Sequence, residues 1–69
     1  MYGYAIVRKG GHQGAAFDRG TLGDIDLASA KRLAQTITSP ALAGKSGLEV
    51  IVLDDNHAEV WRGPYIGAR

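Results

Sequence analysis

The chain has 69 residues, enough for one small domain spanning residues 1–69 and too few to fill a second hydrophobic core. It contains no cysteine, which excludes disulfide bonds and thiolate metal sites. With 45% hydrophobic and 22% charged residues it should fold, and its net charge of +1 removes any strong electrostatic argument for nucleic acid or for an acidic partner.

The N-terminal part of the chain predicts a strand, a glycine loop and a short returning strand. Residues 2–9 alternate between two faces as a strand does. Residues 10–14 must form a turn or loop, because three of these five positions are glycine. Residues 15–18 can return as a second strand that is closed by Gly20 and Gly23, which would make a hairpin across the glycine loop.

The next segment carries the clearest helix signal in the chain. Asp24 and Asp26 are both candidates for the N-cap, and carboxylates are favoured at that end of a helix. From Leu27 onward the apolar side chains recur at helical spacing, which predicts a helix over residues 27–38. Pro40 disfavours helical geometry at the residue before it, so the helix should end there.

The C-terminal part predicts a β-hairpin followed by a tail. Residues 40–47 are mostly small and form a loop that leads into the hairpin. The hairpin spans residues 48–62 with a turn at residues 54–57, and residues 63–69 form the C-terminal tail. The expected fold class is therefore α+β: a small, mainly antiparallel sheet of three to four strands, with one amphipathic helix on one face.

The register of the hairpin suggests that this protein has a partner. A turn centred on Asp55 and Asn56 pairs Leu53 with Ala58 and places Val50 opposite Trp61, leaving both faces of the hairpin substantially apolar. One helix can cover only one face. The other face then needs the C-terminal tail, a second copy of the chain or a different partner, and we favour a homodimer because cyclic dimers are the commonest assembly.

Aromatic residues and arginine are enriched at protein-binding hot spots, and the hairpin and tail supply both. The expected partner-binding residues are Val50, Val52, Trp61, Arg62 and Tyr65. The same kinds of side chain could instead stack on single-stranded nucleic acid, with Tyr2 and Tyr4 completing the platform and Arg8 supplying charge.

The glycine loop is the candidate site for a small ligand or nucleotide. Backbone donors and an imidazole could meet an anion there, from the residues Gly10, Gly11, His12, Gln13 and Gly14. The segment Gly44–Ser46 lacks the earlier glycine of a phosphate-binding P-loop. We expect no metal site, because a hairpin turn adequately explains Asp54, Asp55 and His57.

These observations predict binding rather than chemistry. No nucleophile and base stand in a recognisable arrangement, so we expect neither an enzyme nor a cofactor.

The apolar run in residues 1–10 is too short for a signal peptide, and no stretch reaches the length of a membrane span, so we expect a cytoplasmic protein without membrane contact. The expected function is a homodimeric protein-interaction module, such as a regulator, an inhibitor or a phage-type accessory protein. Binding of single-stranded nucleic acid and binding of a small ligand or nucleotide by residues 10–14 are the alternatives.

Overall fold

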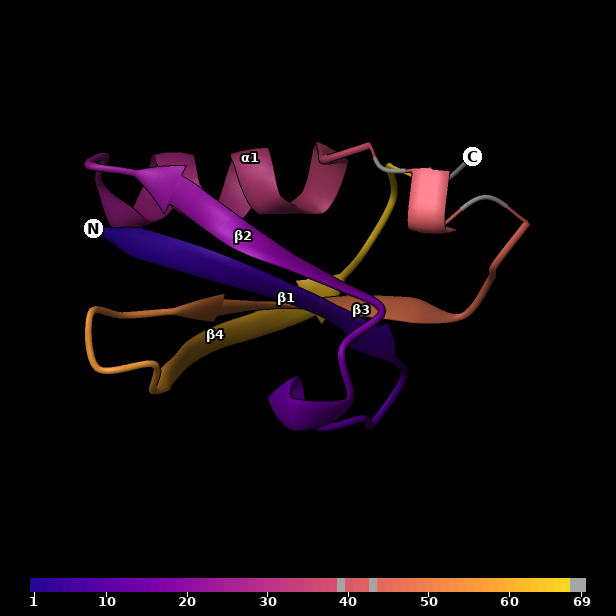
Figure 1. The fold of residues 1–69 in the computed structure, drawn as a ribbon. Helices are drawn as coiled ribbons and strands as arrows, with labels where there is room; N and C mark the ends of the chain where they lie inside the picture. Colours follow the sequence, from indigo (N-terminus) through magenta and orange to yellow (C-terminus); the bar gives the residue numbers. More distant parts are fainter. Residues whose placement is uncertain (39, 43, 68–69) are drawn as a thin grey trace.

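The chain folds into an antiparallel sheet with α1 on one face and a short turn, η1, on the other (Figure 1). The computed structural model describes residues 1–38, 40–42 and 44–67. In chain order, the elements are β1 (Tyr2–Arg8), the 3-10 turn η1 (Gln13–Ala15), β2 (Asp18–Gly23), α1 (Leu27–Thr36), the 3-10 turn η2 (Pro40–Leu42), β3 (Leu48–Leu53) and β4 (Glu59–Pro64).

The sheet has four strands in the order β2-β1-β3-β4, and all three neighbouring pairs are antiparallel. The two hairpins of the chain therefore lie side by side, joined through β1 and β3 in the centre of the sheet. The expected α+β class, a small antiparallel sheet with one helix on one face, is confirmed. Among the described residues, no helix is long and apolar enough to cross a membrane.

Helix α1 begins and ends for identifiable reasons. Asp26 is the N-cap, and its side chain accepts a hydrogen bond of 2.7 Å from the backbone N–H of Ser29. This bond lowers the pKa of the Asp26 carboxyl, because it stabilises the charged form. The helix ends at Thr36, two residues earlier than expected, since the backbone is already extended at Ile37. Its inner face is made of alanine, so the helix can lie close to the sheet.

The central strand β3 is buried on both of its faces. Val50 and Val52 point toward α1 and belong to the larger core cluster, whereas Ile51 and Leu53 belong to a second cluster on the opposite face. Ile51 has no exposed surface. The second face is therefore covered within the chain, and η1 lies over that side of the sheet (Figure 1).

The structure corrects the expected position of the second strand. Residues 13–15 form η1, and β2 runs over residues 18–23 rather than 15–18. Gly20, expected to end the strand, lies inside it, because a Cβ there would come within 2.9 Å of the Tyr4 ring on β1. The glycine thus makes room for an aromatic side chain on the neighbouring strand.

The expected hairpin register is also wrong. Val52 pairs with Trp61 and Leu53 with Glu59, whereas Val50 pairs with Gly63. The cause lies partly in the turn, where the Asp54 N–H donates to the Ala58 carbonyl (3.0 Å) and encloses a three-residue loop. An irregularity between Val52 and Leu53 adds a further residue on the partner strand, and β4 consequently extends to Pro64.

The segment after β4 packs on the helix side of the sheet. The Tyr65 hydroxyl donates a hydrogen bond to the carbonyl of Ile37, and the Ile66 N–H donates to the carbonyl of Gln35 (3.0 Å). The Gln35 amide in turn donates to the Pro64 carbonyl (3.1 Å). The described part of the tail, residues 63–67, therefore closes the C-terminal end of α1 and does not cover the second face. Residues 68–69 lie outside the described part of the chain.

Candidate functional site

The expected partner-binding residues fall into two groups in the structure. Val50 and Val52 have 0% exposure beneath α1, and Tyr65 is buried in the same cluster. Trp61 and Arg62 remain partly exposed, on opposite faces of β4. Only these two residues of the five present surface that a partner could touch without moving the helix.

Trp61 lies on the helix side of the sheet. Its ring crosses Gly63, where a Cβ would collide with the indole, and it packs against the helix-side core. The Lys31 ammonium lies 5.8 Å from the ring centroid, which is within the range of a cation–π contact. Tyr2 and Tyr4 also pack against this core. These rings therefore do not line one open sheet face of the kind that stacks nucleic-acid bases.

Arg62 lies on the second face and is engaged in ion pairs. Its guanidinium contacts Glu49 and Glu59, each at 3.1 Å. The pKa of Glu49 is lowered first by a hydrogen bond from the Gly10 N–H and then by Arg62, whose own pKa is raised by the two carboxylates. Arg62 therefore links β4 to β3, and through Glu49 to the glycine loop.

The glycine loop does not offer a free set of backbone donors. The Gly10 N–H donates to Glu49 (2.9 Å), and the Gly11 N–H donates to the Arg8 carbonyl (2.7 Å). His12 is exposed at the rim of a hollow of about 360 Å³ on one side of the loop. Gln13 reaches the other side and lines a different pocket. Of the five residues in the predicted ligand loop, Gln13 is therefore the one that lines this second pocket.

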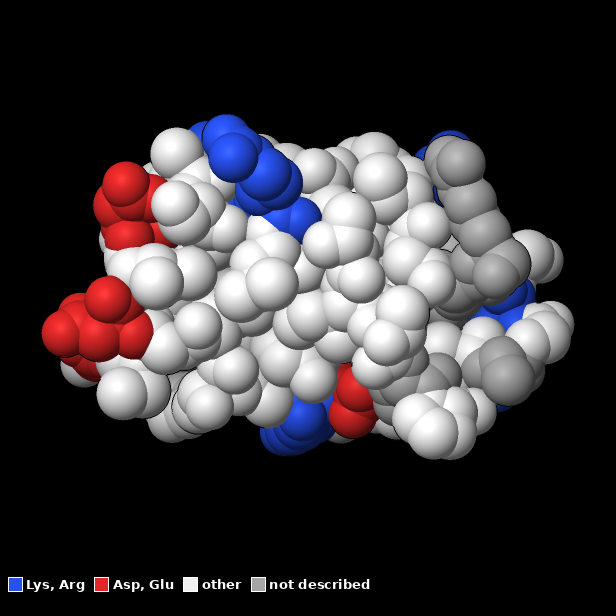
Figure 2. Space-filling model, turned by 90° about the horizontal axis from the view of Figure 1, so that it is seen from above, with Lys and Arg blue, Asp and Glu red and all other residues white. Residues whose placement is uncertain are grey.

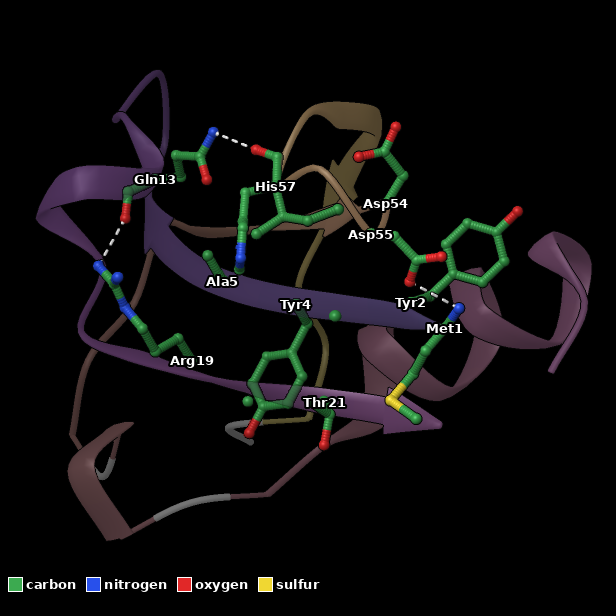
Figure 3. Close-up of a pocket in the computed structure, with 13 residues that line it drawn as sticks. Met1, Tyr2, Tyr4, Ala5, Gln13, Arg19, Thr21, Asp54, Asp55 and His57 are labelled. Carbon is green, nitrogen blue, oxygen red and sulfur yellow. Dashed lines mark hydrogen bonds and ion pairs between the residues drawn. The ribbon is translucent and has the colours of Figure 1, made fainter. Parts of the chain in front are cut away.

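This second pocket is a concave site built from four separate segments of the chain (Figure 3). It has a volume of about 270 Å³ and brings together the start of β1, the middle of β2, η1 and the turn between β3 and β4. Its lining residues are Met1, Tyr2, Gly3, Tyr4, Ala5, Gln13, Arg19, Gly20, Thr21, Leu53, Asp54, Asp55 and His57. The sequence separates these segments widely, so only the sheet topology could have revealed the site.

Gln13 connects two of the polar groups at this pocket. Its side-chain amide donates to the backbone carbonyl of His57 (3.0 Å), and its backbone carbonyl accepts from the guanidinium of Arg19 (2.8 Å). Figure 3 shows the His57 imidazole directed toward Ala5, between these two residues. A single turn, η1, thus holds the backbone of the β3–β4 turn and the Arg19 side chain of β2 at one end of the pocket.

His57 has an unusual backbone conformation. Its φ is +62°, in the left-handed region where glycine and asparagine are favoured, and in the described residues it is the only non-glycine residue with positive φ. The Asp54 carboxylate supports the turn by accepting hydrogen bonds from the N–H groups of Asn56 (2.8 Å) and Ala58 (2.9 Å). The expected role of Asp54 in a hairpin turn is therefore confirmed. No group of three or more metal-ligand side chains occurs in residues 1–38, 40–42 and 44–67.

The two outer strands of the sheet differ in how they are protected. An edge strand presents unpaired N–H and C=O groups, which can pair with another chain. The edge at β4 ends at Pro64, which has no N–H, and it carries the charged side chains of Glu59 and Arg62. Each outer strand also has one irregularity in its pairing, next to Trp61 in β4 and next to Leu22 in β2. The edge at β2 has no proline, and two of its three exposed residues, Gly20 and Thr21, are small and uncharged; the third is Arg19. Of the two edges, the one at β2 is therefore the less protected.

The exposed surface of α1 includes an apolar side chain on its β2 side. Figure 2 looks down on α1 and shows charged groups around the periphery, with an uncharged area between them. Leu33 of α1 is 46% exposed. Lys31 and Gln35 face β4, so helical geometry places Leu33 on the opposite flank, toward β2. The β2 edge is thus flanked by an exposed apolar side chain.

In comparisons with known proteins, no family model, no curated protein and no solved structure matches this chain.

Proposed function

We propose that this chain is a protein-interaction module that acts through the outer edge of β2, and that its partner there is a second copy of itself. The single observation that carries the proposal is that the edge at β4 ends at a proline, whereas the edge at β2 has none and has small, uncharged residues at its centre. Antiparallel pairing of two β2 strands would join two four-stranded sheets into one continuous sheet and remove both open edges.

The sequence of β2 is compatible with pairing to itself. In an antiparallel pair centred on Gly20 or Thr21, neither Asp18 nor Arg19 stands opposite its own copy, so like charges do not meet directly. A two-fold axis at this position would also bring the Leu33 flanks of both copies toward the interface. The exposed leucine then becomes buried, which favours association.

Light scattering coupled to size-exclusion chromatography tests this proposal, with Thr21→Lys and Leu33→Lys as the disrupting variants. A lysine on an edge strand disfavours strand pairing, and a lysine at position 33 removes the apolar contact. Val60→Lys is the matched control, because Val60 is 42% exposed but lies on β4. We expect the unmodified chain and the control to be dimers and both test variants to be monomers.

Two results would overturn the proposal. A strictly monomeric unmodified chain at high concentration would exclude the self-association. A dimer that survives both test variants, but dissociates in Val60→Lys, would place the interface on β4 instead. Circular dichroism and thermal melting of each variant confirm that a monomer is a folded monomer.

A further inference from the structure

The pocket beside η1 has the features of a small-molecule site, separate from the edge contact proposed above. Small-molecule sites are concave and largely apolar, with a few polar groups that fix orientation, and span roughly 300–1,000 Å³. At about 270 Å³ this pocket is slightly smaller than that range, which restricts its occupant to a small organic molecule. Gly3, Ala5 and Leu53 supply apolar surface from the second face of β1 and β3.

One end of the pocket is rich in hydrogen-bond donors. The Arg19 guanidinium is oriented by its bond to the Gln13 carbonyl, and the His57 imidazole points into the same region (Figure 3). Within the described residues, Arg19 makes no ion pair with a carboxylate, in contrast to Arg62 with its two. A guanidinium has five donors in a planar fork that matches a carboxylate. Arg19 therefore keeps donors available for an anion.

The opposite end of the pocket limits the charge that an anion can carry. Asp54 and Asp55 line that end, and Asp55 forms an ion pair of 2.8 Å with the Met1 ammonium group. Two carboxylates at one end disfavour a doubly charged phosphate more than a singly charged organic acid. An apolar body is also better suited than a hydrated anion to the surface of Ala5 and Leu53.

We infer that this pocket binds a small organic carboxylate, with its carboxylate group between Arg19 and His57 and its apolar body on Gly3, Ala5 and Leu53. Gln13 is a positioning residue, because it holds both the guanidinium and the turn that carries the imidazole. The conformation of His57 supports this role: the position favours glycine or asparagine, yet it carries a ring that is directed into the pocket.

The test is an NMR titration of the ¹⁵N-labelled chain with benzoate, an aromatic monocarboxylate of suitable size. Benzamide serves as the neutral probe of the same shape, and inorganic phosphate as the anion without an apolar body. We expect benzoate to shift the amide signals of residues 3–5, 13, 19–21 and 53–57, with benzamide and phosphate binding at least about tenfold more weakly, because a charge-assisted hydrogen bond is lost or the apolar contact is absent.

Variants assign the site. Arg19→Gln should weaken benzoate binding about tenfold, whereas Arg8→Gln, with the same change of charge at the end of β1, should leave it unchanged. His57→Asn removes the imidazole but is compatible with the left-handed backbone, so its expected loss of affinity does not come from unfolding. Light scattering on the same samples separates this result from association through β2.

Three outcomes would overturn the inference: no shift with benzoate, equal binding of benzamide and benzoate, or equal losses in Arg19→Gln and Arg8→Gln. Tighter binding of phosphate than of benzoate would also contradict it, because the acidic end and the apolar surface would then have no effect on the choice of ligand.

Discussion

Replacing Ile51 tests whether the chain itself covers the second face of its sheet. Ile51 is 0% exposed in the cluster opposite α1, packed with Ala5, Val7 and Leu53, with Ala16 from the end of the glycine loop against them. Truncation of a buried isoleucine to alanine costs about 2–5 kcal/mol. Because loop residues rather than a helix cover this face, they can relax into the cavity, so we expect about 2–3 kcal/mol for Ile51→Ala.

The assay is urea unfolding followed by circular dichroism, at two protein concentrations. A small domain has only about 5–15 kcal/mol of stability, so Ile51→Val, with an expected loss of about 0.5–1.5 kcal/mol, keeps the measurement within range if the alanine variant does not fold. Val60→Ala is the exposed control and should stay within about 0.5 kcal/mol of the unmodified chain. A loss for Ile51→Ala as small as that of the control would refute the covered face. A loss that shrinks on dilution would show that a second copy covers it.

Two further predictions concern the local contacts of β4 and α1. Gly63→Ala should displace the Trp61 ring, because the added Cβ collides with the indole. We expect the free energy of unfolding to fall by about 1–3 kcal/mol and the tryptophan fluorescence to shift to the red. An unchanged spectrum would contradict the placement of the ring. Asp26→Ala should destabilise the chain by removing the N-cap bond to Ser29, and it should also remove a pH dependence. Since the folded-state pKa of Asp26 lies below its ordinary value of 3.8, its stabilising effect is present above that pH and is lost as the pH falls through the lower, folded-state pKa. Acid titrations of unfolding that coincide for Asp26→Ala and the unmodified chain would exclude this role.

The helix and the existence of the C-terminal hairpin could be predicted from the sequence because both depend on local patterns. The apolar stripe of residues 27–37 and the Asp26 cap specify α1 without reference to the rest of the chain. The register of the hairpin could not be predicted in this way. It depends on the left-handed backbone conformation of His57 and on an irregularity in β4. A histidine in the sequence does not by itself predict a left-handed conformation.

The second strand and the candidate sites depended on tertiary contacts. Gly20 reads as the end of a strand, and only the Tyr4 ring on the neighbouring strand explains why it lies inside one. Val50 and Val52 were expected at a partner surface, but the alanine face of α1 lets the helix pack directly on them. The pocket joins Gln13 to residues far along the chain, and no local signal indicates that contact.

Light scattering of the unmodified chain beside Thr21→Lys at high concentration tests the central claim, association through the open edge of β2, most directly. The structure places Thr21 in the exposed middle of β2, where a lysine changes the edge without entering either core cluster. We expect twice the monomer mass for the unmodified chain and the monomer mass for the variant. Equal masses for the two, whether monomer or dimer, would contradict the claim.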